Sequence, residues 1–397
     1  MASLVLCTAT GDVLGVLPPY RADLPWWQDA ESLVRGVREN HGVEVTILRL
    51  LDAALPASPG GAVTYLVEVD AGMALELPLL PWSGVLEDHP LRLPYAELGG
   101  PGRDLAWAAT ALHEHGLRQT GPAHQMRTWN LSSLWRIPIE AGSVWLKCVP
   151  PFFAHEGAIL AALQGAAVPR LLAADGGRIL MAQIPGEDQY DAPAPTLLAL
   201  VSILVTLQGE WAGREDELLA LGLPDWRAEP LSEAIESVVR QTAPGIAEED
   251  RSTLDALLAG LPQRFASLAE CGVPDSLVHG DFAPGNARGD ASSLVLLDWG
   301  DCGVGHPLLD QSAFLDRIPA ALVPAVRTHW SAQWRRVVPD SDAARVADLL
   351  APVAAARQAV IYQGFLDQIE PSEHPYHRDD PALWLGRAAA LAKEAPG

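Results

Sequence analysis

The chain has 397 residues, of which 49% are hydrophobic and 19% are charged. This composition is typical of a globular protein large enough for two or three domains. The formal net charge of −23 argues against a nucleic-acid or anionic-membrane partner, and the longest apolar runs are shorter than the ~20 residues of a membrane span. An acidic balance suits a cationic small molecule, although it more often reflects only a well-solvated surface.

The N-terminal segment and the cysteines indicate a cytoplasmic protein. The start, MASLVLCTATGDVLG, has no basic segment and reaches Asp12 quickly, unlike a secretory signal peptide. The four cysteines lie far apart and form no C-x-x-C pair. Neither a disulfide framework nor a zinc knuckle is therefore expected.

Residues 1–100 predict a small α/β domain. Two short β-rich runs precede a segment with helical periodicity, WQDAESLVRGVRENHG, which Gly42 closes as a C-cap. Two further β-rich runs follow, VEVTILRLL and AVTYLVEVD. The Pro/Gly-rich stretch at 96–104 is typical of a linker.

Residues 101–187 predict a second, β-rich domain, and residues 188–397 a helical one. A helix over 104–117 is followed by the strand patterns TWNLSSLWRIPI and GSVWLKCV, a helix near 153–163, and two short strands. Beyond the Pro-Gly pair at 185–186 the periodicity is helical from about 194 to 272 and again from 308 to the end, and only the loop and strand of the motifs below lie between. A β-rich lobe is thus expected to precede a helical lobe.

Lys147 stands out because only two of the 27 basic residues are lysines. It lies in the middle of an apolar strand pattern, where an ammonium group needs an anionic partner. Glu156, nine residues later, is expected in the first turns of the next helix and is the candidate partner. The alternative is a surface lysine whose stem lies along the strand.

The segment LVHGDFAPGN places Asp281 and Asn286 five residues apart. Kinase catalytic loops use this spacing, in which the Asp orients the attacking hydroxyl and the Asn binds a metal ion. Pro284 and Gly285 between them favour a tight turn. A generic turn of Asp, Asn, Gly and Pro explains the segment equally well. We interpret His279 as a structural hydrogen-bonding residue rather than a base.

Asp298 ends the buried-strand pattern SLVLLDWG. An ionised carboxylate in that position needs a cation, and Mg²⁺ is the usual one beside phosphates. A lone Asp-Trp-Gly carries little information. The ordered combination of a strand lysine, a helix glutamate, the Asp-Asn pair and this Asp favours phosphoryl transfer from a nucleotide.

These segments resemble the aminoglycoside phosphotransferase and choline kinase family, whose pattern is HGD-x-x-x-x-N, a strand, and then D-W-x-x-x-x-x-G-x-P-x-x-D. The resemblance covers about residues 100–397 and implies a bilobal, protein-kinase-like α+β fold. It implies that Asp281 is the catalytic acid/base and that Asn286 and Asp298 bind Mg²⁺. It also implies a nucleotide site in which the side chains or backbone of the following residues take part: Lys147, Glu156, Ser132, Ser133, Gln183 and Ile184.

Several details depart from, or extend, that pattern. The nucleotide-covering segment TWNLSSLWRI has no Gly-rich signature, so Ser132 and Ser133 would have to bind the phosphates through hydroxyl and backbone donors. The resemblance also implies that Gly305, Pro307 and Asp310 fix the loop and the following helix.

The first 100 residues resemble a degenerate Nudix domain, through PWWQDAESLVRGVRENHGVEV. The Arg38-Glu39 pair is present, but both later acidic residues of the metal-binding box are missing. The resemblance therefore implies a packing, gating or dimerisation role without hydrolysis. A cap of unrelated fold is the alternative.

The leading hypothesis is a Mg²⁺-dependent kinase that uses ATP or GTP to phosphorylate a hydroxyl of a small molecule, an aminoglycoside, an amino sugar or a similar cationic metabolite. The acceptor is expected near Asp301 and the segment 362–377. There, Asp367, Glu370 and Glu373 either bind an amine or, as the better supported interpretation, form a solvated helix face. The competing hypotheses are a nucleotide-binding regulatory pseudokinase and a Nudix-type hydrolase with a kinase-like appendage. No oligomeric state follows from the sequence.

Overall fold

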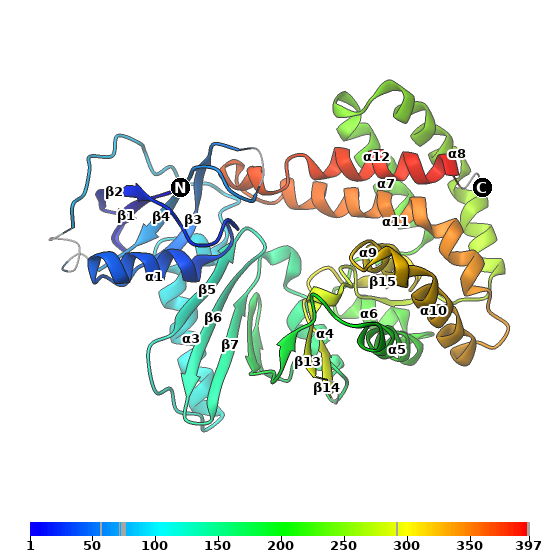
Figure 1. Cartoon of the computed structure of the whole chain (residues 1–397), viewed down its shortest axis with the longest axis horizontal. Coiled ribbons are helices and arrows are strands. Elements are labelled where there is room, and N and C mark those ends of the chain that lie inside the picture. Colours follow the sequence, from blue (N-terminus) through cyan, green and yellow to red (C-terminus); the bar gives the residue numbers. More distant parts are fainter. Residues whose placement is uncertain (56–57, 71, 73–76, 291–292, 395–397) are drawn as a thin grey trace. The chain divides into compact units, whose positions relative to one another are not determined.

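The computed structural model describes the whole chain except residues 56–57, 71, 73–76, 291–292 and 395–397. Contacts between residues divide the chain into two compact units, one rich in strands and one mainly helical (Figure 1). Unit 1 comprises Met1–Gly157, Leu171–Gln183 and Phe365–Asp379, and unit 2 comprises Ala158–Arg170, Ile184–Gly364 and Asp380–Gly397. A mixed α+β composition, with strands first and helices later, is what the sequence predicted.

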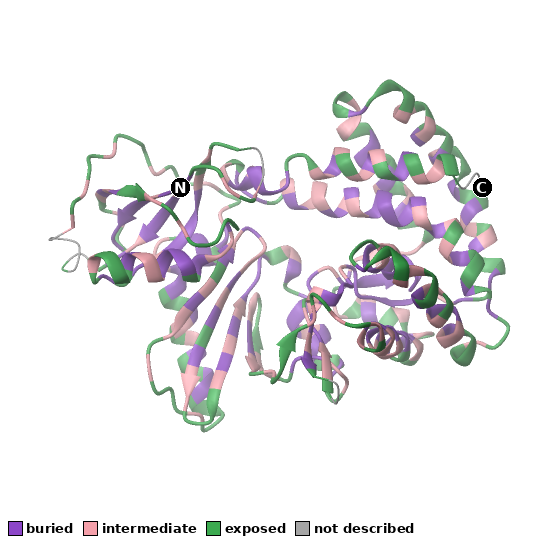
Figure 2. Ribbon diagram, in the orientation of Figure 1, coloured by how far each residue is buried: buried purple, intermediate pink, exposed green. Residues whose placement is uncertain are grey.

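Unit 1 begins with a four-stranded mixed sheet in the order β2-β1-β4-β3, in which only the β1–β4 pair is parallel. Its strands are β1 (Ala2–Cys7), β2 (Val13–Tyr20), β3 (Thr46–Ala53) and β4 (Val63–Glu68). Helix α1 (Ala30–His41) begins at Asp29, whose carboxylate accepts a hydrogen bond from the Ser32 N–H, and ends at Gly42 in the left-handed conformation. Figure 2 shows β1 and β4 as mostly buried strands.

The second sheet of unit 1 is antiparallel and has the order β5-β6-β7-β9-β8. Its strands are β5 (His124–Trp129), β6 (Ser132–Ile139), β7 (Gly142–Cys148), β8 (Leu171–Asp175) and β9 (Arg178–Ala182). Apolar residues of this sheet, among them Trp135 and Leu146, form one core with helix α3. The 3₁₀ turns of the unit are η1 (Pro94–Ala96), η2 (Pro151–Phe153) and η6 (Pro371–Tyr376).

Helix α3 (Gly100–Glu114) corrects the predicted linker at 96–104, because its first turn lies inside that stretch. Gly99 adopts a left-handed conformation just before the helix, and Pro101 stands in the first turn. A proline is compatible with that turn, whose N–H groups have no partner within the helix. The Gly/Pro composition therefore marks a helix start rather than an irregular connection.

Strand β5 is the edge of the second sheet, and residues of the first 50 positions cover it. The Gln125 side chain accepts a hydrogen bond from the Ile47 N–H (2.9 Å) and donates one to the Ile47 carbonyl (2.8 Å). The Thr128 N–H donates to the carbonyl of Gln28 (3.0 Å). One buried amide thus satisfies both backbone groups of a residue in β3.

The segment Phe365–Asp379 belongs to unit 1 although it follows the long helix α11. Tyr376 packs edge-on against Trp27 and Trp129, with ring centroids 5.6 Å apart in each case. It is thereby part of the core beneath the first sheet.

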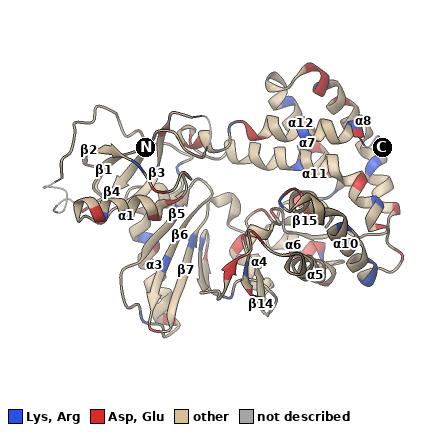
Figure 3. Cartoon of the chain, viewed as in Figure 1, with Lys and Arg blue, Asp and Glu red and all other residues tan. Residues whose placement is uncertain are grey.

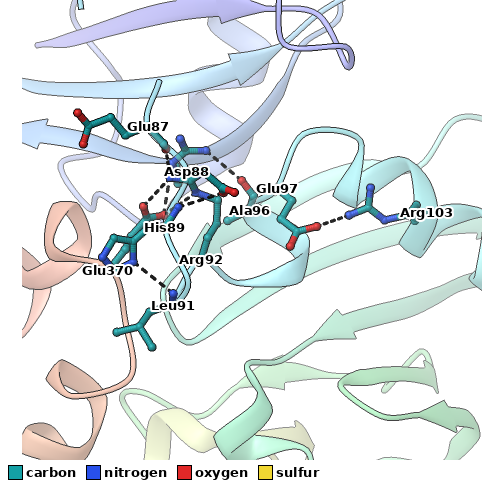
Figure 4. A network of polar contacts seen from close by, with 10 residues as sticks. Glu87, Asp88, His89, Leu91, Arg92, Ala96, Glu97, Arg103 and Glu370 are labelled. Atoms are coloured by element: carbon teal, nitrogen blue, oxygen red, sulfur yellow. Dashed lines mark hydrogen bonds and ion pairs between the residues drawn. The ribbon is translucent and has the colours of Figure 1, made fainter. Parts of the chain in front are cut away.

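Two glutamates of this segment are buried against the N-terminal region, which corrects the expectation of an amine site or a solvated face. Glu370 forms ion pairs with Arg49 (3.4 Å) and Arg92 (3.0 Å), as Figure 4 shows for Arg92. Glu373 accepts a hydrogen bond from the Leu50 N–H (2.8 Å). We call Arg49, Arg92, Glu370 and Glu373 the domain cluster. Asp367, by contrast, is exposed.

Unit 2 consists mainly of helices, over which acidic and basic residues are interspersed (Figure 3). These are α5 (Ala194–Trp211), α6 (Glu215–Ala220), α7 (Ala228–Thr242), α8 (Glu248–Glu270), α9 (Leu309–Asp316), α10 (Val323–Val337), α11 (Ala343–Leu366, whose last two residues belong to unit 1) and α12 (Asp380–Glu394), with α4 (Glu156–Ala162) beginning in unit 1 and the 3₁₀ turns η3 (Ala243–Gly245), η4 (Pro284–Asn286) and η5 (Ala320–Leu322).

Of the helices in the described residues, α5 alone is long and apolar enough to cross a membrane by length and composition. Its residues Leu197, Leu200, Val201 and Leu204 are almost completely buried within the protein. A core helix passes the same test, and α5 is one.

The short strands of unit 2 form two three-stranded sheets, ordered β10-β13-β14 and β11-β15-β12. They are β10 (Glu187–Asp188), β11 (Asp225–Trp226), β12 (Ser276–Val278), β13 (Ala287–Asp290), β14 (Ser293–Leu296) and β15 (Gly303–Gly305). The predicted residues Asp281, Asn286 and Asp298 lie between β12 and β15, so these small sheets fix the backbone on both sides of the candidate site.

Candidate active site

Asp281 follows β12, and Asn286 ends the turn η4. The Asn286 Nδ2 donates hydrogen bonds to the Asp281 carbonyl (2.8 Å) and to Asp281 Oδ2 (2.7 Å). The five-residue spacing therefore closes a compact loop in which the amide holds the carboxylate. Asp281 remains partly exposed, as a group that meets a substrate must be.

The hairpin of β13 and β14 carries Asp298 back to Asn286. Ala287 pairs with Leu296, and the Leu297 N–H donates to the Asn286 carbonyl (2.8 Å). Asp298 is exposed, and among the described residues it is the one non-glycine with a positive φ, +62°. A strained backbone at an acidic residue persists where the surroundings impose it, which is typical of functional sites.

Buried polar groups hold the peptide before Asp281. Asp310 accepts hydrogen bonds from the N–H groups of His279 and Gly280, both at 2.8 Å, and from Gln208 Nε2 (2.9 Å). Arg357 Nη1 donates to the Gly280 carbonyl (3.3 Å). We call Gly280, Asp310 and Arg357 the loop cluster.

His279 is completely buried, and its Nε2 lies 2.9 Å from the Leu297 carbonyl. Burial lowers the pKa of its imidazole, although the carboxylates of Asp310, Asp281 and Asp298 act in the opposite direction. A buried imidazole bonded to backbone suits the structural role that the sequence predicted for it.

Lys147 lies in β7, and its Nζ is 2.7 Å from Glu156 Oε1 at the start of α4. Both side chains are largely buried, with exposures of 11% and 2%. The structure therefore brings these two predicted residues together, and the lysine is not the surface side chain of the alternative interpretation. Because the pair is shielded from water, the glutamate fixes the position of the ammonium group.

The other predicted nucleotide contacts lie at the ends of strands. Ser132 and Ser133 open β6, where their hydroxyls accept hydrogen bonds from the indoles of Trp129 (3.3 Å) and Trp135 (3.1 Å). Ser133 is completely buried, and its role at the nucleotide site stays a prediction.

The other two predicted nucleotide residues, Gln183 and Ile184, stand on either side of the boundary between the two units. The exposed Gln183 accepts a hydrogen bond from the Trp145 indole (2.6 Å). The Ile184 carbonyl accepts one from Arg288 Nε (3.0 Å). Both residues thus have protein partners.

Two arginines at the site were not singled out in the sequence. Arg357, in α11, is 1% exposed and holds the backbone of Gly280. Arg317, directly after α9, forms an ion pair with Asp281 (2.7 Å). The only sequence signal for Arg317 is its spacing of seven residues from Asp310, which puts Arg317 and Asp310 on one face of a helix.

The donor set suits a divalent cation of the magnesium type. The Asn286 Nδ2 donates to Asp281, so the amide oxygen is the atom of this side chain that could bind a cation. Asp298 supplies an exposed carboxylate one residue beyond Leu297, which bonds to Asn286. Mg²⁺ is commonly bound by one or two such oxygens, with phosphates and waters completing the octahedron.

Comparison with known proteins gives one family and a set of similar folds. The phosphotransferase enzyme family model (APH) matches residues 149–349. No curated protein matches the sequence. A Ralstonia eutropha protein assigned as an aminoglycoside phosphotransferase superposes with a TM-score of 0.53 at 16% identity, over 75% of this chain and 99% of its own.

Two further solved structures give similar values. The macrolide 2′-phosphotransferase from Brachybacterium faecium has a TM-score of 0.51 at 18% identity, over 70% of this chain and 97% of its own. A choline/ethanolamine kinase family protein from Mesorhizobium loti has a TM-score of 0.51 at 15% identity, over 73% of this chain and 95% of its own. These likenesses confirm the predicted protein-kinase-like fold. The Nudix resemblance of the first 100 residues has no support among them and stays a prediction.

Proposed function

Because this chain belongs to the phosphotransferase enzyme family, we propose that it is a small-molecule kinase. It transfers the γ-phosphate of ATP or GTP, with Mg²⁺, to a hydroxyl of an aminoglycoside, an amino sugar or a similar metabolite. The predicted family and enzyme class are confirmed; the donor, the acceptor and the role of each residue are the proposal. A cytoplasmic location, where both nucleotides are abundant, fits it.

The observation that carries the proposal is the Asp281–Asn286 loop beside Asp298. The Asn286 amide and Arg317 each hold one oxygen of the Asp281 carboxylate, which keeps further lone pairs for an acceptor hydroxyl. Asp281 thus orients the hydroxyl and accepts its proton as the phosphoryl group arrives. Asn286 and Asp298 hold the metal that neutralises the phosphates.

Lys147 supplies the cation for the nucleotide phosphates in this proposal, and Glu156 orients it. A buried ammonium at the end of a strand is a compact point charge suited to phosphate oxygens. The ion pair at 2.7 Å supports this role. The charge is held in place before the nucleotide arrives, which lowers the cost of reorganisation.

The surroundings of Tyr362 favour an amine-bearing acceptor. Burial, followed by the charges of Asp380, Asp281 and Asp301, raises the pKa of this phenol. Three carboxylates thus act on one side chain in the part of unit 2 that carries Asp281. A hydroxylated molecule with an ammonium group meets attraction there, and an anionic one meets repulsion.

The test is a screen of hydroxylated antibiotics and metabolites with ATP or GTP and Mg²⁺, followed by kinetics on any acceptor. Asp281→Asn should lower kcat by roughly 10²–10⁴-fold and leave the affinity for an ATP analogue, measured by calorimetry, unchanged. A wild-type protein that binds the nucleotide but phosphorylates no acceptor would favour the regulatory pseudokinase instead. Failure to bind either nucleotide would refute both.

A further inference from the structure

Three side chains on one face of α9 and its C-terminal cap face the segment that carries Asp281. Asp310, Phe314 and Arg317 stand at positions i, i+4 and i+7. These positions lie on the same side of a helix, one turn apart. The face is therefore a continuous strip, acidic at its start, aromatic in the middle and basic at its end.

Each member of the strip contacts a different part of the segment 279–282. Asp310 binds the two backbone N–H groups before Asp281. Phe314 stacks on Phe282, with ring centroids 4.6 Å apart and an interplanar angle of 12°. Arg317 Nη1 donates to Asp281 Oδ1 at 2.7 Å.

We propose that Arg317 is the positioning residue for the catalytic carboxylate, holding Asp281 Oδ1 as the last contact of the α9 strip. This inference rests on the proposed kinase function and deepens it. Asp310 fixes the backbone and Asn286 fixes Oδ2, but neither restrains Oδ1. Without Arg317, the carboxylate pivots about its remaining hydrogen bond, and the acceptor hydroxyl loses its fixed partner.

The charge of Arg317 has a second consequence. Asp281 and the incoming phosphoryl group are both anionic, so their approach is unfavourable. A guanidinium beside the carboxylate offsets that repulsion in the step where phosphate and base come closest. Burial lowers the pKa of Arg317, but the charge of Asp281 and its hydrogen bond more than compensate, so the pKa is raised and the group stays cationic.

A merely structural ion pair is the competing explanation. The two side chains are 43% and 32% exposed, and exposed pairs of this kind contribute little to stability. A structural pair would alter the unfolding midpoint but not the turnover of the folded enzyme. The two explanations therefore predict different kinetics.

The experiment compares Arg317→Met and Arg317→Lys in the wild-type and Asp281→Asn backgrounds. The readout is phosphoryl transfer to an acceptor found by screening, or slow nucleotide hydrolysis, in which water is the acceptor. Arg317→Met should lower kcat roughly 10- to 100-fold, because misplaced catalytic groups cost about that much. The KM for the nucleotide should change by less than about twofold, since only transition-state positioning is lost. Arg317→Lys should recover part of kcat.

The double variant decides whether Arg317 acts through Asp281. In the Asp281→Asn background, Arg317→Met should cause no further loss, because the coupled partner is already gone. The control is Arg327→Met, which removes a similarly exposed ion pair, to Asp348, and should leave kcat unchanged. An unchanged kcat in Arg317→Met, or an equal loss in both backgrounds, overturns the proposal.

Activity of the wild type separates failure of this inference from failure of the proposed function. If the wild type transfers phosphate or hydrolyses the nucleotide and Arg317→Met leaves kcat unchanged, the inference fails and the kinase function stands. If the wild type shows neither transfer nor hydrolysis, the kinase function is refuted, and the inference, which rests on it, is refuted with it.

Discussion

Two groups of buried charge hold this protein together over very different chain separations. In the loop cluster, Asp310 binds the N–H of Gly280, 30 residues away. In the domain cluster, Glu373 binds the N–H of Leu50, 323 residues away. Both use a buried carboxylate on a backbone N–H, but the first shapes the loop that carries Asp281 and the second joins a distant segment to the N-terminal sheet.

The same kind of contact positions a loop in one place and joins distant parts of the chain in another. In the loop cluster, three N–H donors bind the Asp310 carboxylate. Substitutions there should lower catalytic activity first. In the domain cluster, Arg49 and Arg92 both form ion pairs with Glu370, and Glu373 binds the Leu50 N–H. Substitutions there should lower stability first. Three substitutions test this division.

The largest effect on stability is expected for Arg49→Met. The Arg49 side chain is 4% exposed and faces Glu370, which is 8% exposed. Breaking a buried ion pair from one side costs about 3–5 kcal/mol of unfolding free energy, and we expect the lower end of this range because Glu370 keeps its ion pair with Arg92. Denaturant unfolding measures this loss. The control Arg118→Met removes an exposed pair with Glu140 and should cost less than about 0.5 kcal/mol; equal losses would remove the domain cluster from the comparison.

Glu373→Gln should change how stability depends on pH. Burial is the main reason that the pKa of Glu373 is raised from 4.5 to about 8; Glu370 acts in the same direction, and the Leu50 N–H and Arg49 act against it. The folded state therefore keeps a proton that the unfolded state has lost, so stability falls as the pH rises from about 4.5 to 8. A glutamine still accepts the Leu50 N–H and carries no charge.

The variant should consequently match the wild type near pH 5 and exceed it by a few kcal/mol near pH 8. Unfolding midpoints measured at intervals across that range provide the comparison. Parallel curves for the two proteins would show that Glu373 does not titrate there.

The largest effect on catalysis is expected for Gly280→Ala. Gly280 has φ +92°, and an added Cβ would lie 1.9 Å from the Asp301 carbonyl oxygen. The overlap and the unfavourable dihedral cost about 3 kcal/mol, and the displaced loop loses the alignment of Asp281. Activity should fall beyond about 10²-fold. Gly213→Ala, at φ +80° with open space around it, should retain activity; similar losses in both would mean that the dihedral alone matters.

The segment that carries Asp281, Asn286 and Asp298 was largely predictable because its signals are local, whereas Arg357 of the loop cluster, 77 residues from Gly280, was not. The spacing of Asp281 and Asn286, and the strand before Asp298, indicate a closed loop and a hairpin within 25 residues. Lys147 was found by the scarcity of lysine and by its apolar strand. Arg317 was not identified from the sequence because exposed arginines are common. Only the helix face that it shares with Asp310 distinguishes it from other arginines.

The domain cluster was not predictable, and the charges near 370 were interpreted wrongly. Glu370 and Glu373 stand in a polar, Pro-containing stretch that is typical of an exposed turn. Their partners Arg49 and Leu50 lie in a β-rich run that gives no sign of a distant contact. Burial of this kind depends on tertiary packing across the whole chain, which no window of neighbouring residues encodes.

The amide of Gln125, which bonds both backbone groups of Ile47, has a consequence for solubility. An uncovered outer strand invites β-pairing between molecules, and proteins commonly block it with a loop or helix. Here residues of the first 50 positions cover the edge strand β5 and block such pairing. A chain shortened to begin at Gly100 would retain Lys147, Asp281 and Asp298. Its edge strand β5 would be exposed, however, and we expect the shortened chain to self-associate through it.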